Sequence, residues 1–111
     1  MGMMQREKGA DWERQVVKLF QAAGFDAKRR AQLQAGAEKK QPDVLADPFW
    51  LECKARKRNA RPVAALEQGA EACPGGRVPV AVCKVNYRRP TVTLYLDDFL
   101  DLAREWRERG E

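Results

Sequence analysis

Histidine and serine, two residue types on which many enzymes depend, are both missing from this sequence of 111 residues. Serine–histidine triads and imidazole acid–base chemistry are therefore excluded, as are the common histidine-containing zinc sites. Cysteine is scarce, and Cys53, Cys73 and Cys83 lack C-x-x-C spacing, which indicates reduced structural thiols and a cytoplasmic (cytosolic) protein. The catalytic groups that remain are carboxylates, lysine and a bound metal ion.

Long apolar runs are also missing. No stretch approaches the roughly eighteen apolar residues of a membrane-spanning helix, and no basic leader with an apolar segment precedes the first predicted helix. We therefore expect neither secretion nor membrane insertion. The hydrophobic content of 44% is ordinary for a globular protein, and residues 1–111 are predicted to form one domain with a modest core.

Positive charge is distributed unevenly along the chain. The net charge is +5, of which residues 1–61 carry +6 and residues 62–111 carry −1. Basic clusters lie at 28–30, 39–40 and 54–58, on either side of two carboxylates. One basic cluster alone is usually a solvated surface run. Three clusters around one acidic centre favour a polyanionic partner whose phosphate is reached through a cation.

The acidic centre is formed by Pro42-Asp43 and by Glu52-Cys53-Lys54. A turn at residues 46–49 would join a strand that begins at Asp43 to a second strand, in which Glu52 and Lys54 face the same side roughly 6–7 Å apart. Two carboxylates can hold a hard divalent cation, and a lysine beside them can position or deprotonate water. Taken alone, Glu-x-Lys on an exposed strand is more often a solvated ion pair.

A third carboxylate belongs to a helix predicted over residues 9–23 and ended by Gly24. At about 100° per residue, Glu13 falls inside the apolar arc of this helix. A carboxylate that faces the core needs an arginine partner or a cation, and Asp43 and Glu52 nearby favour a shared metal site. The apolar arc consists of Trp12, Val16, Val17, Leu19, Phe20 and Ala23.

The remaining pattern predicts an α/β fold, a sandwich around a mixed sheet with the order helix, three strands, helix, two strands, helix. Asp97 is expected to cap the final helix, and Tyr95 and Trp106 to complete the core. Besides the elements above, we predict a strand at 25–30, a polar loop at 31–41, a helix at 62–73, a strand at 78–85 and a strand at 91–96. The apolar stripes of the last two helices are Val63, Leu66, Ala70 and Cys73, and Phe99, Leu102, Ala103 and Trp106.

Several motifs, taken in their order along the chain, resemble those of a known family. The run from Arg6 to Val17, then Ala23-Gly24-Phe25, Pro42-Asp43-Val44 and Leu51-Glu52-Cys53-Lys54, resembles the archaeal and phage-type Holliday junction resolvases of the PD-(D/E)xK nuclease superfamily. The resemblance implies a restriction-endonuclease-like core and a structure-selective endonuclease that resolves four-way junctions by paired phosphodiester hydrolysis. It also implies branched DNA as the substrate, a homodimer, and Mg²⁺ as cofactor, with Mn²⁺ able to substitute and no organic cofactor.

The resemblance further implies roles for particular residues. Catalysis would involve Glu13, Asp43, Glu52, Lys54 and Gln68, of which the three carboxylates, together with the backbone carbonyl of Cys53, would bind the metal. Many family members carry a serine in the loop before Pro42, where this chain has none, and Gln32 or Gln34 would contact DNA there instead. The other DNA contacts are expected from Arg6, Lys28, Arg29, Arg30, Lys39, Lys40, Arg56, Lys57 and Arg58.

Two other functions remain open at this point. A repair or restriction-type nuclease of the same superfamily would share every site residue, although a single domain without a base-reading module favours recognition of shape. A non-catalytic nucleic-acid-binding protein would use only the basic clusters. The complete set of carboxylates disfavours it, because binding alone has no need for side chains that repel phosphate.

Overall fold

The structure, a computed structural model, describes residues 2–33 and 40–110, except for the side chains of residues 2–7. The predicted α/β order is confirmed, with one short helix added after the first strand. In chain order the elements are α1 (Gly2–Ala22), β1 (Lys28–Arg29), α2 (Arg30–Leu33), β2 (Val44–Ala46), β3 (Phe49–Arg56), α3 (Pro62–Ala72), β4 (Val78–Val85), β5 (Thr91–Thr93) and α4 (Leu96–Glu108).

The strands form one mixed sheet in the order β1-β2-β3-β4-β5. β2 pairs antiparallel with β3 through the turn at Asp47 and Pro48, with Val44 opposite Leu51. β3 and β4 pair in parallel along their whole length, and α3 makes the crossover between them. The antiparallel pairs β1–β2 and β4–β5 complete the two edges.

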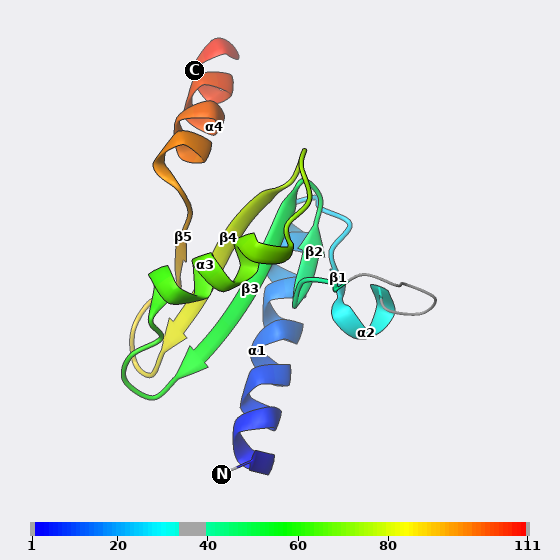
Figure 1. Cartoon of the computed structure of the whole chain (residues 1–111), viewed down its shortest axis with the longest axis vertical. Coiled ribbons are helices and arrows are strands. Elements are labelled where there is room, and N and C mark those ends of the chain that lie inside the picture. The colour runs from blue at the N-terminus through cyan, green and yellow to red at the C-terminus, as the bar shows by residue number, and fades with distance from the viewer. Residues whose placement is uncertain (1, 34–39, 111) are drawn as a thin grey trace.

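Two helices cover the two faces of this sheet (Figure 1). On one face α1 packs Trp12 and Val16 against alternate residues of β3, among them Leu51 and Cys53. On the other face α3 packs Leu66 against β4. The predicted alternation along β3 is thus confirmed: Leu51 and Cys53 face α1, while Glu52 is next to α3.

Helix α1 is longer and less buried than its apolar pattern predicted. It begins at Gly2 rather than Gly9, and Leu19 is 58% exposed although it belongs to the predicted arc. The stripe that contacts the sheet centres on Trp12 and Val16, and the Trp12 indole donates a hydrogen bond to the carbonyl oxygen of Val82 at 3.0 Å. This bond fixes the position of α1 relative to the sheet, and with it the position of Glu13.

The outer strands are shorter than predicted. The strand expected over residues 25–30 is reduced to β1, because Arg30 already starts α2, and the strand expected over 91–96 ends at Thr93. β1 pairs with β2 through two residues, and β5 pairs with β4 through three. On α3, Leu66 is buried as predicted, but Val63 is exposed, and the other buried residues are Ala65 and Gly69 rather than Ala70 and Cys73.

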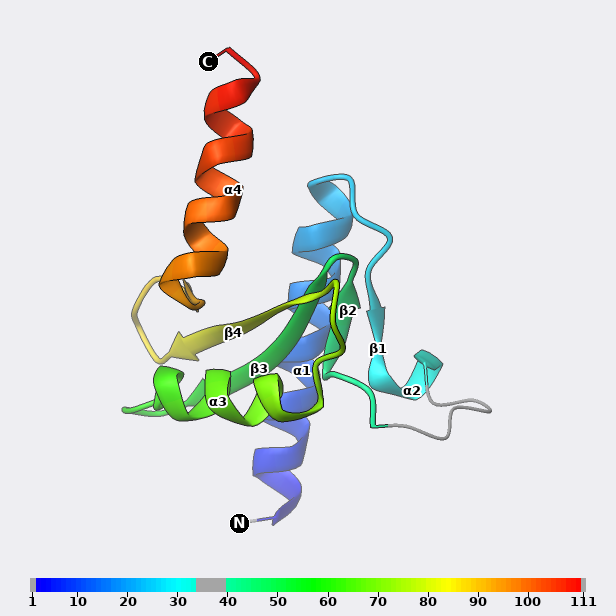
Figure 2. The ribbon, with the colours of Figure 1, turned by 45° about the horizontal axis from the view of Figure 1, so that its top comes forward.

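Helix α4 extends beyond the sheet, as Figures 1 and 2 show. None of its residues is buried, and Trp106 is 66% exposed. The prediction that Trp106 and Tyr95 complete the core was therefore wrong. Tyr95, not Asp97, occupies the N-cap position of the helix, and no side chain caps it. An apolar stripe predicted the helix correctly, but it did not reveal what covers that stripe.

Candidate active site

The two strand carboxylates lie side by side at the β2–β3 pairing. Asp43 directly precedes β2, and the register that sets Val44 opposite Leu51 sets Asp43 opposite Glu52. The backbone N–H of Cys53 donates to Asp43 Oδ2 at 2.9 Å, which fixes the orientation of this carboxylate. Hence the sequence prediction that a tight turn brings Asp43 to Glu52 is confirmed.

Glu52 is almost fully buried, at 3% exposure, between the sheet and α3. Desolvation, and after it the charge of Asp43, raises the pKa of Glu52 from its ordinary value of 4.5 to about 7. Gly69 of α3 provides the space for this side chain, because a Cβ atom built on Gly69 would lie only 2.9 Å from Glu52 Cγ. Sequence reasoning missed Gly69, although a glycine inside a helix costs about 1 kcal/mol relative to alanine and is therefore a signal.

Lys54 lies two residues further along β3, on the same face as Glu52 and half-buried. Its positive charge partly offsets the pKa rise of Glu52, so the two side chains interact electrostatically. The parallel register places Lys54 next to Cys83 of β4. In the described part of the chain, no carboxylate forms an ion pair with Lys54.

Glu13 reaches the same site from α1. Its side chain is 22% exposed and pairs with Arg29, whose Nη2 lies 3.1 Å from Glu13 Oε1. Burial raises the pKa of Glu13, and the negative charge of Asp43 raises it further, while Arg29 opposes both effects. Glu13 and Asp43 therefore share one electrostatic environment, and they line the same open hollow together with Arg29 and Arg30.

Two arginines that were predicted to bind DNA are the counter-ions of these carboxylates. Arg30 Nη2 lies 2.7 Å from Asp43 Oδ1, and the Arg30 backbone N–H donates to the Asp43 carbonyl at 3.0 Å. Arg30 Nε is buried without a hydrogen-bond partner in the described structure. Gln32 of the short helix α2 accepts a hydrogen bond from the Arg29 backbone N–H at 3.0 Å, which ties Arg29 to this helix. In the basic segment at 28–30, the side chains of Arg29 and Arg30 thus face the site carboxylates.

The donor set suits a divalent cation. Carboxylate oxygens from α1, from the residue before β2 and from β3 are the hard ligands that such ions prefer, and a cation would relieve the repulsion between Asp43 and Glu52. Among the side chains that the structure describes, those of residues 8–33 and 40–110, however, no three acidic or cysteine side chains are already arranged as a metal cage. Arg29 and Arg30 already engage oxygens of Glu13 and Asp43. A bound cation would have to compete with these two arginines.

The other predicted residues are more scattered. Gln68 lies on the exposed side of α3, one residue before Gly69, and the thiol of Cys53 points into the core on the α1 face. Lys28 pairs loosely with Asp26 at 3.8 Å. Gln34 and Lys39 lie outside the described residues, and so does the side chain of Arg6. The remaining basic residues of the prediction are all exposed: Lys40, Arg56, Lys57 and Arg58.

A mixed sheet between α1 and α3, with Asp43, Glu52 and Lys54 together on adjacent strands, defines a restriction-endonuclease-like protein of the PD-(D/E)xK class. A comparison with solved structures supports this fold. Hjc of Archaeoglobus fulgidus, a Holliday junction resolvase from an archaeal hyperthermophile, matches with a TM-score of 0.53 and 22% sequence identity, over 76% of this chain and 73% of that chain. At this identity the likeness shows the fold alone.

The family model of the archaeal Holliday junction resolvase (Hjc) matches residues 4–68, which is more than half of the sequence. The chain belongs to the archaeal Holliday junction resolvase family. Family membership implies a nuclease that acts on DNA. No curated protein matches the chain. Within the described residues, no helix is long and apolar enough to span a membrane.

Proposed function

We propose that this protein is a Mg²⁺-dependent, structure-selective DNA endonuclease that resolves four-way junctions by paired phosphodiester hydrolysis. The observation that carries the proposal is the position of Asp43 opposite Glu52, with Lys54 on the same face of β3, in a chain of the resolvase family. A protein that only bound DNA would gain nothing from a buried carboxylate pair, because that pair repels phosphate.

Asp43, Glu52 and Glu13 would hold the cation, with the backbone carbonyl of Cys53 as a further ligand. When bound, Mg²⁺ or Mn²⁺ would supply Lewis-acid stabilisation of the negative charge that develops on the phosphate. The protein contributes the arrangement of the ligands. The Cys53 N–H orients Asp43, Gly69 leaves room for Glu52, and Trp12 fixes the height of Glu13 on α1.

Lys54 would orient the attacking water and offset the charge of the phosphate. Its position supports both roles, since it lies two residues after Glu52 on the same strand face and has no ion pair with a described carboxylate. An ammonium group held close to the reacting phosphate stabilises developing negative charge without needing to rearrange. Gln68, on the outer side of α3, is a weaker candidate for positioning the same water.

Two opposing strands of a junction have to be cut, whereas each chain contains one set of Glu13, Asp43, Glu52 and Lys54. A two-fold dimer would present two such sites. We propose that a second copy covers the apolar surface of β5 and α4, because a contiguous exposed apolar surface typically marks an interface. This surface comprises Val92, Tyr95, Leu96, Phe99, Leu100 and Trp106, each exposed by 39% or more.

A cleavage assay tests the central proposal. A four-way junction and a linear duplex of the same sequence are incubated with Mg²⁺, Mn²⁺, Ca²⁺ or EDTA. We expect paired nicks in the junction with Mg²⁺ or Mn²⁺, and binding with little turnover in Ca²⁺, because the larger ion prefers looser coordination. Full activity in EDTA would contradict the metal mechanism, and equal cutting of linear duplex would favour a general nuclease.

Analytical ultracentrifugation tests the dimer. Substituting Phe99→Gln together with Trp106→Gln removes apolar surface from α4 and should convert dimer to monomer, with loss of paired but not of single nicks. Leu19→Gln is the matched control, since Leu19 is similarly exposed, at 58%, but lies on α1. A wild-type protein that is monomeric at micromolar concentration would refute the dimer.

A further inference from the structure

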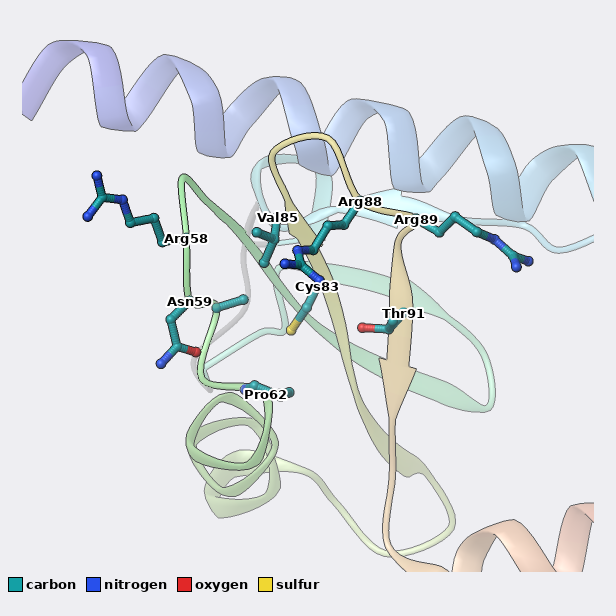
Figure 3. A pocket seen from close by; sticks show the side chains of 9 residues that line it. Arg58, Asn59, Pro62, Cys83, Val85, Arg88, Arg89 and Thr91 are labelled. Carbon is teal, nitrogen blue, oxygen red and sulfur yellow. The ribbon is translucent and has the colours of Figure 1, made fainter.

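A hollow lined by three arginines lies near the ends of β3 and β4 (Figure 3). It has a volume of about 160 Å³ and opens between the segment that leads into α3 and the turn that joins β4 to β5. Arg58 comes from the first segment, and Arg88 and Arg89 come from the turn. In Figure 3 the Arg88 side chain is directed toward Cys83, while Arg58 and Arg89 extend to either side.

The segments that form this hollow carry positive charge and contain no acidic residue that would neutralise it. Residues 53–66 and 72–96 contain no Asp or Glu. Among the described residues, no carboxylate pairs with Arg58, Arg88 or Arg89, whereas Arg14, Arg29, Arg30, Arg77 and Arg104 each have such a partner. A guanidinium group matches the geometry of phosphate through two parallel hydrogen bonds. The Arg88 guanidinium, directed toward Cys83 in the lining of the hollow and with Arg58 and Arg89 on either side, therefore suits a phosphate there.

Backbone and side-chain contacts hold the turn in place before any ligand arrives. The Asn86 N–H donates to the Arg56 carbonyl at 3.2 Å, which joins the turn to the end of β3. The Lys8 ammonium donates to Asn86 Oδ1 at 3.1 Å and joins it to α1. Since the turn is tied to two elements that also carry the active site, the distance from the hollow to that site is constrained.

The hollow opens on the same sheet face as Lys54. Cys83 lies beside Lys54 on β4, and Thr91 lies beside Cys83 on β5; both Cys83 and Thr91 line the hollow. Two strand spacings amount to about 10 Å. Along the axis of a duplex, where the rise is ~3.4 Å per nucleotide, that distance corresponds to about three nucleotides. A strand whose phosphate is cut beside Lys54 would thus pass the hollow a few nucleotides away.

We propose that this hollow binds a backbone phosphate of the DNA substrate, a few nucleotides from the phosphate that is cut. The proposal rests on the proposed nuclease function and adds Arg88 and Arg89 to the DNA-binding residues. Arg88 contacts the phosphate directly, and Arg58 and Arg89 extend the basic surface along the strand on either side. Such contacts fix the position of the DNA without reading its sequence.

Two single substitutions test the site. Arg88→Gln removes one positive charge just after β4, and Arg77→Gln removes one just before β4, where Arg77 pairs with Asp47. Junction affinity is measured in Ca²⁺ over a series of salt concentrations. Arg88→Gln should weaken binding roughly ten- to a hundredfold. It should also lower the slope of log affinity against log salt by about 0.9, whereas Arg77→Gln should change neither.

Substrates with one neutral methylphosphonate locate the contact. Moved stepwise along the strand, the neutral link should weaken wild-type binding most at one position within about four nucleotides of the cut. The Arg88→Gln variant should be insensitive to it at that position. Wild-type affinity and salt slope in Arg88→Gln, while the wild-type protein still cuts junctions, would overturn the phosphate site and leave the nuclease function standing. A wild-type protein that neither binds nor cuts DNA would overturn both.

Discussion

Arginines near the carboxylates and arginines around the hollow beyond β4 differ in what they face. Arg29 and Arg30 neutralise Glu13 and Asp43 at 3.1 and 2.7 Å. Arg88 and Arg89, in contrast, stand on a turn with no acidic residue in the surrounding segment. Arginine therefore neutralises the protein's own carboxylates in one region and is available to an external anion in the other. Sequence clusters of positive charge do not distinguish these two situations.

The largest expected effect concerns the carboxylate region. Asp43→Asn removes a metal ligand and should reduce junction cleavage at least about a thousandfold, since electrostatic groups at a reacting centre contribute on that scale. DNA binding should be retained or tightened, because one negative charge that faces phosphate is lost. Single-turnover cleavage and binding in Ca²⁺ measure the two quantities separately. Wild-type turnover by this variant in Mg²⁺ would refute the site.

A second test uses the pH dependence of stability. The pKa of Glu52 is about 7 in the folded protein and 4.5 ordinarily, so the folded state retains a proton that the unfolded state loses between these values. Stability of the metal-free protein should therefore fall as pH rises from 4.5 to 7, by an amount on the order of 3 kcal/mol.

Thermal denaturation in EDTA at several pH values measures this slope. Glu52→Gln should flatten it, leaving only a smaller slope in the same direction from Glu13, whose pKa is also raised. An equal slope in wild type and Glu52→Gln would show that Glu52 is already ionised in the folded protein at low pH. Arg88→Gln is the control, because it should leave the slope unchanged.

The third test compares the two kinds of arginine directly. Arg30→Gln leaves Asp43 without its counter-ion next to Glu52, and should lower the unfolding free energy of the metal-free protein by about 1–3 kcal/mol. Arg88→Gln should change it by less than about 0.5 kcal/mol, as surface substitutions usually do. Adding Mg²⁺ should raise the melting temperature of Arg30→Gln more than that of wild type, because a competing cation has been removed. Equal shifts would contradict this competition.

The smallest expected effect compares two helical glycines. In Gly69→Ala the new methyl group would meet Glu52 Cγ at 2.9 Å, whereas in Gly9→Ala it meets nothing within 4 Å. Gly9→Ala should stabilise the protein by up to about 1 kcal/mol through helix propensity. Gly69→Ala should instead lose about 1 kcal/mol or more through overpacking, and its cleavage rate should fall because Glu52 is displaced. Equal melting temperatures for both variants would show that the Glu52 site is not tightly packed.

Most of the fold and the centre of the site followed from local patterns in the chain. The alternation in β3, the apolar run of β4 and the turn at residues 46–49 depend on interactions within a few residues. These local rules were sufficient to place Asp43 opposite Glu52 and Lys54 on the same face. They also identified the carboxylate of Glu13 as one that needs a partner.

What those patterns left undecided depends on long-range packing. Whether Glu13 meets an arginine, whether Arg30 faces Asp43 or solvent, and which residue of α3 makes room for Glu52 all depend on how separate elements approach one another. The apolar stripe of α4 predicted a helix but not its partner, because burial is a property of the assembled surface and not of one segment. The sequence by itself thus determined which functional groups are available at the site. The tertiary structure decided which arginines are already paired with carboxylates and which are left free to bind an anion.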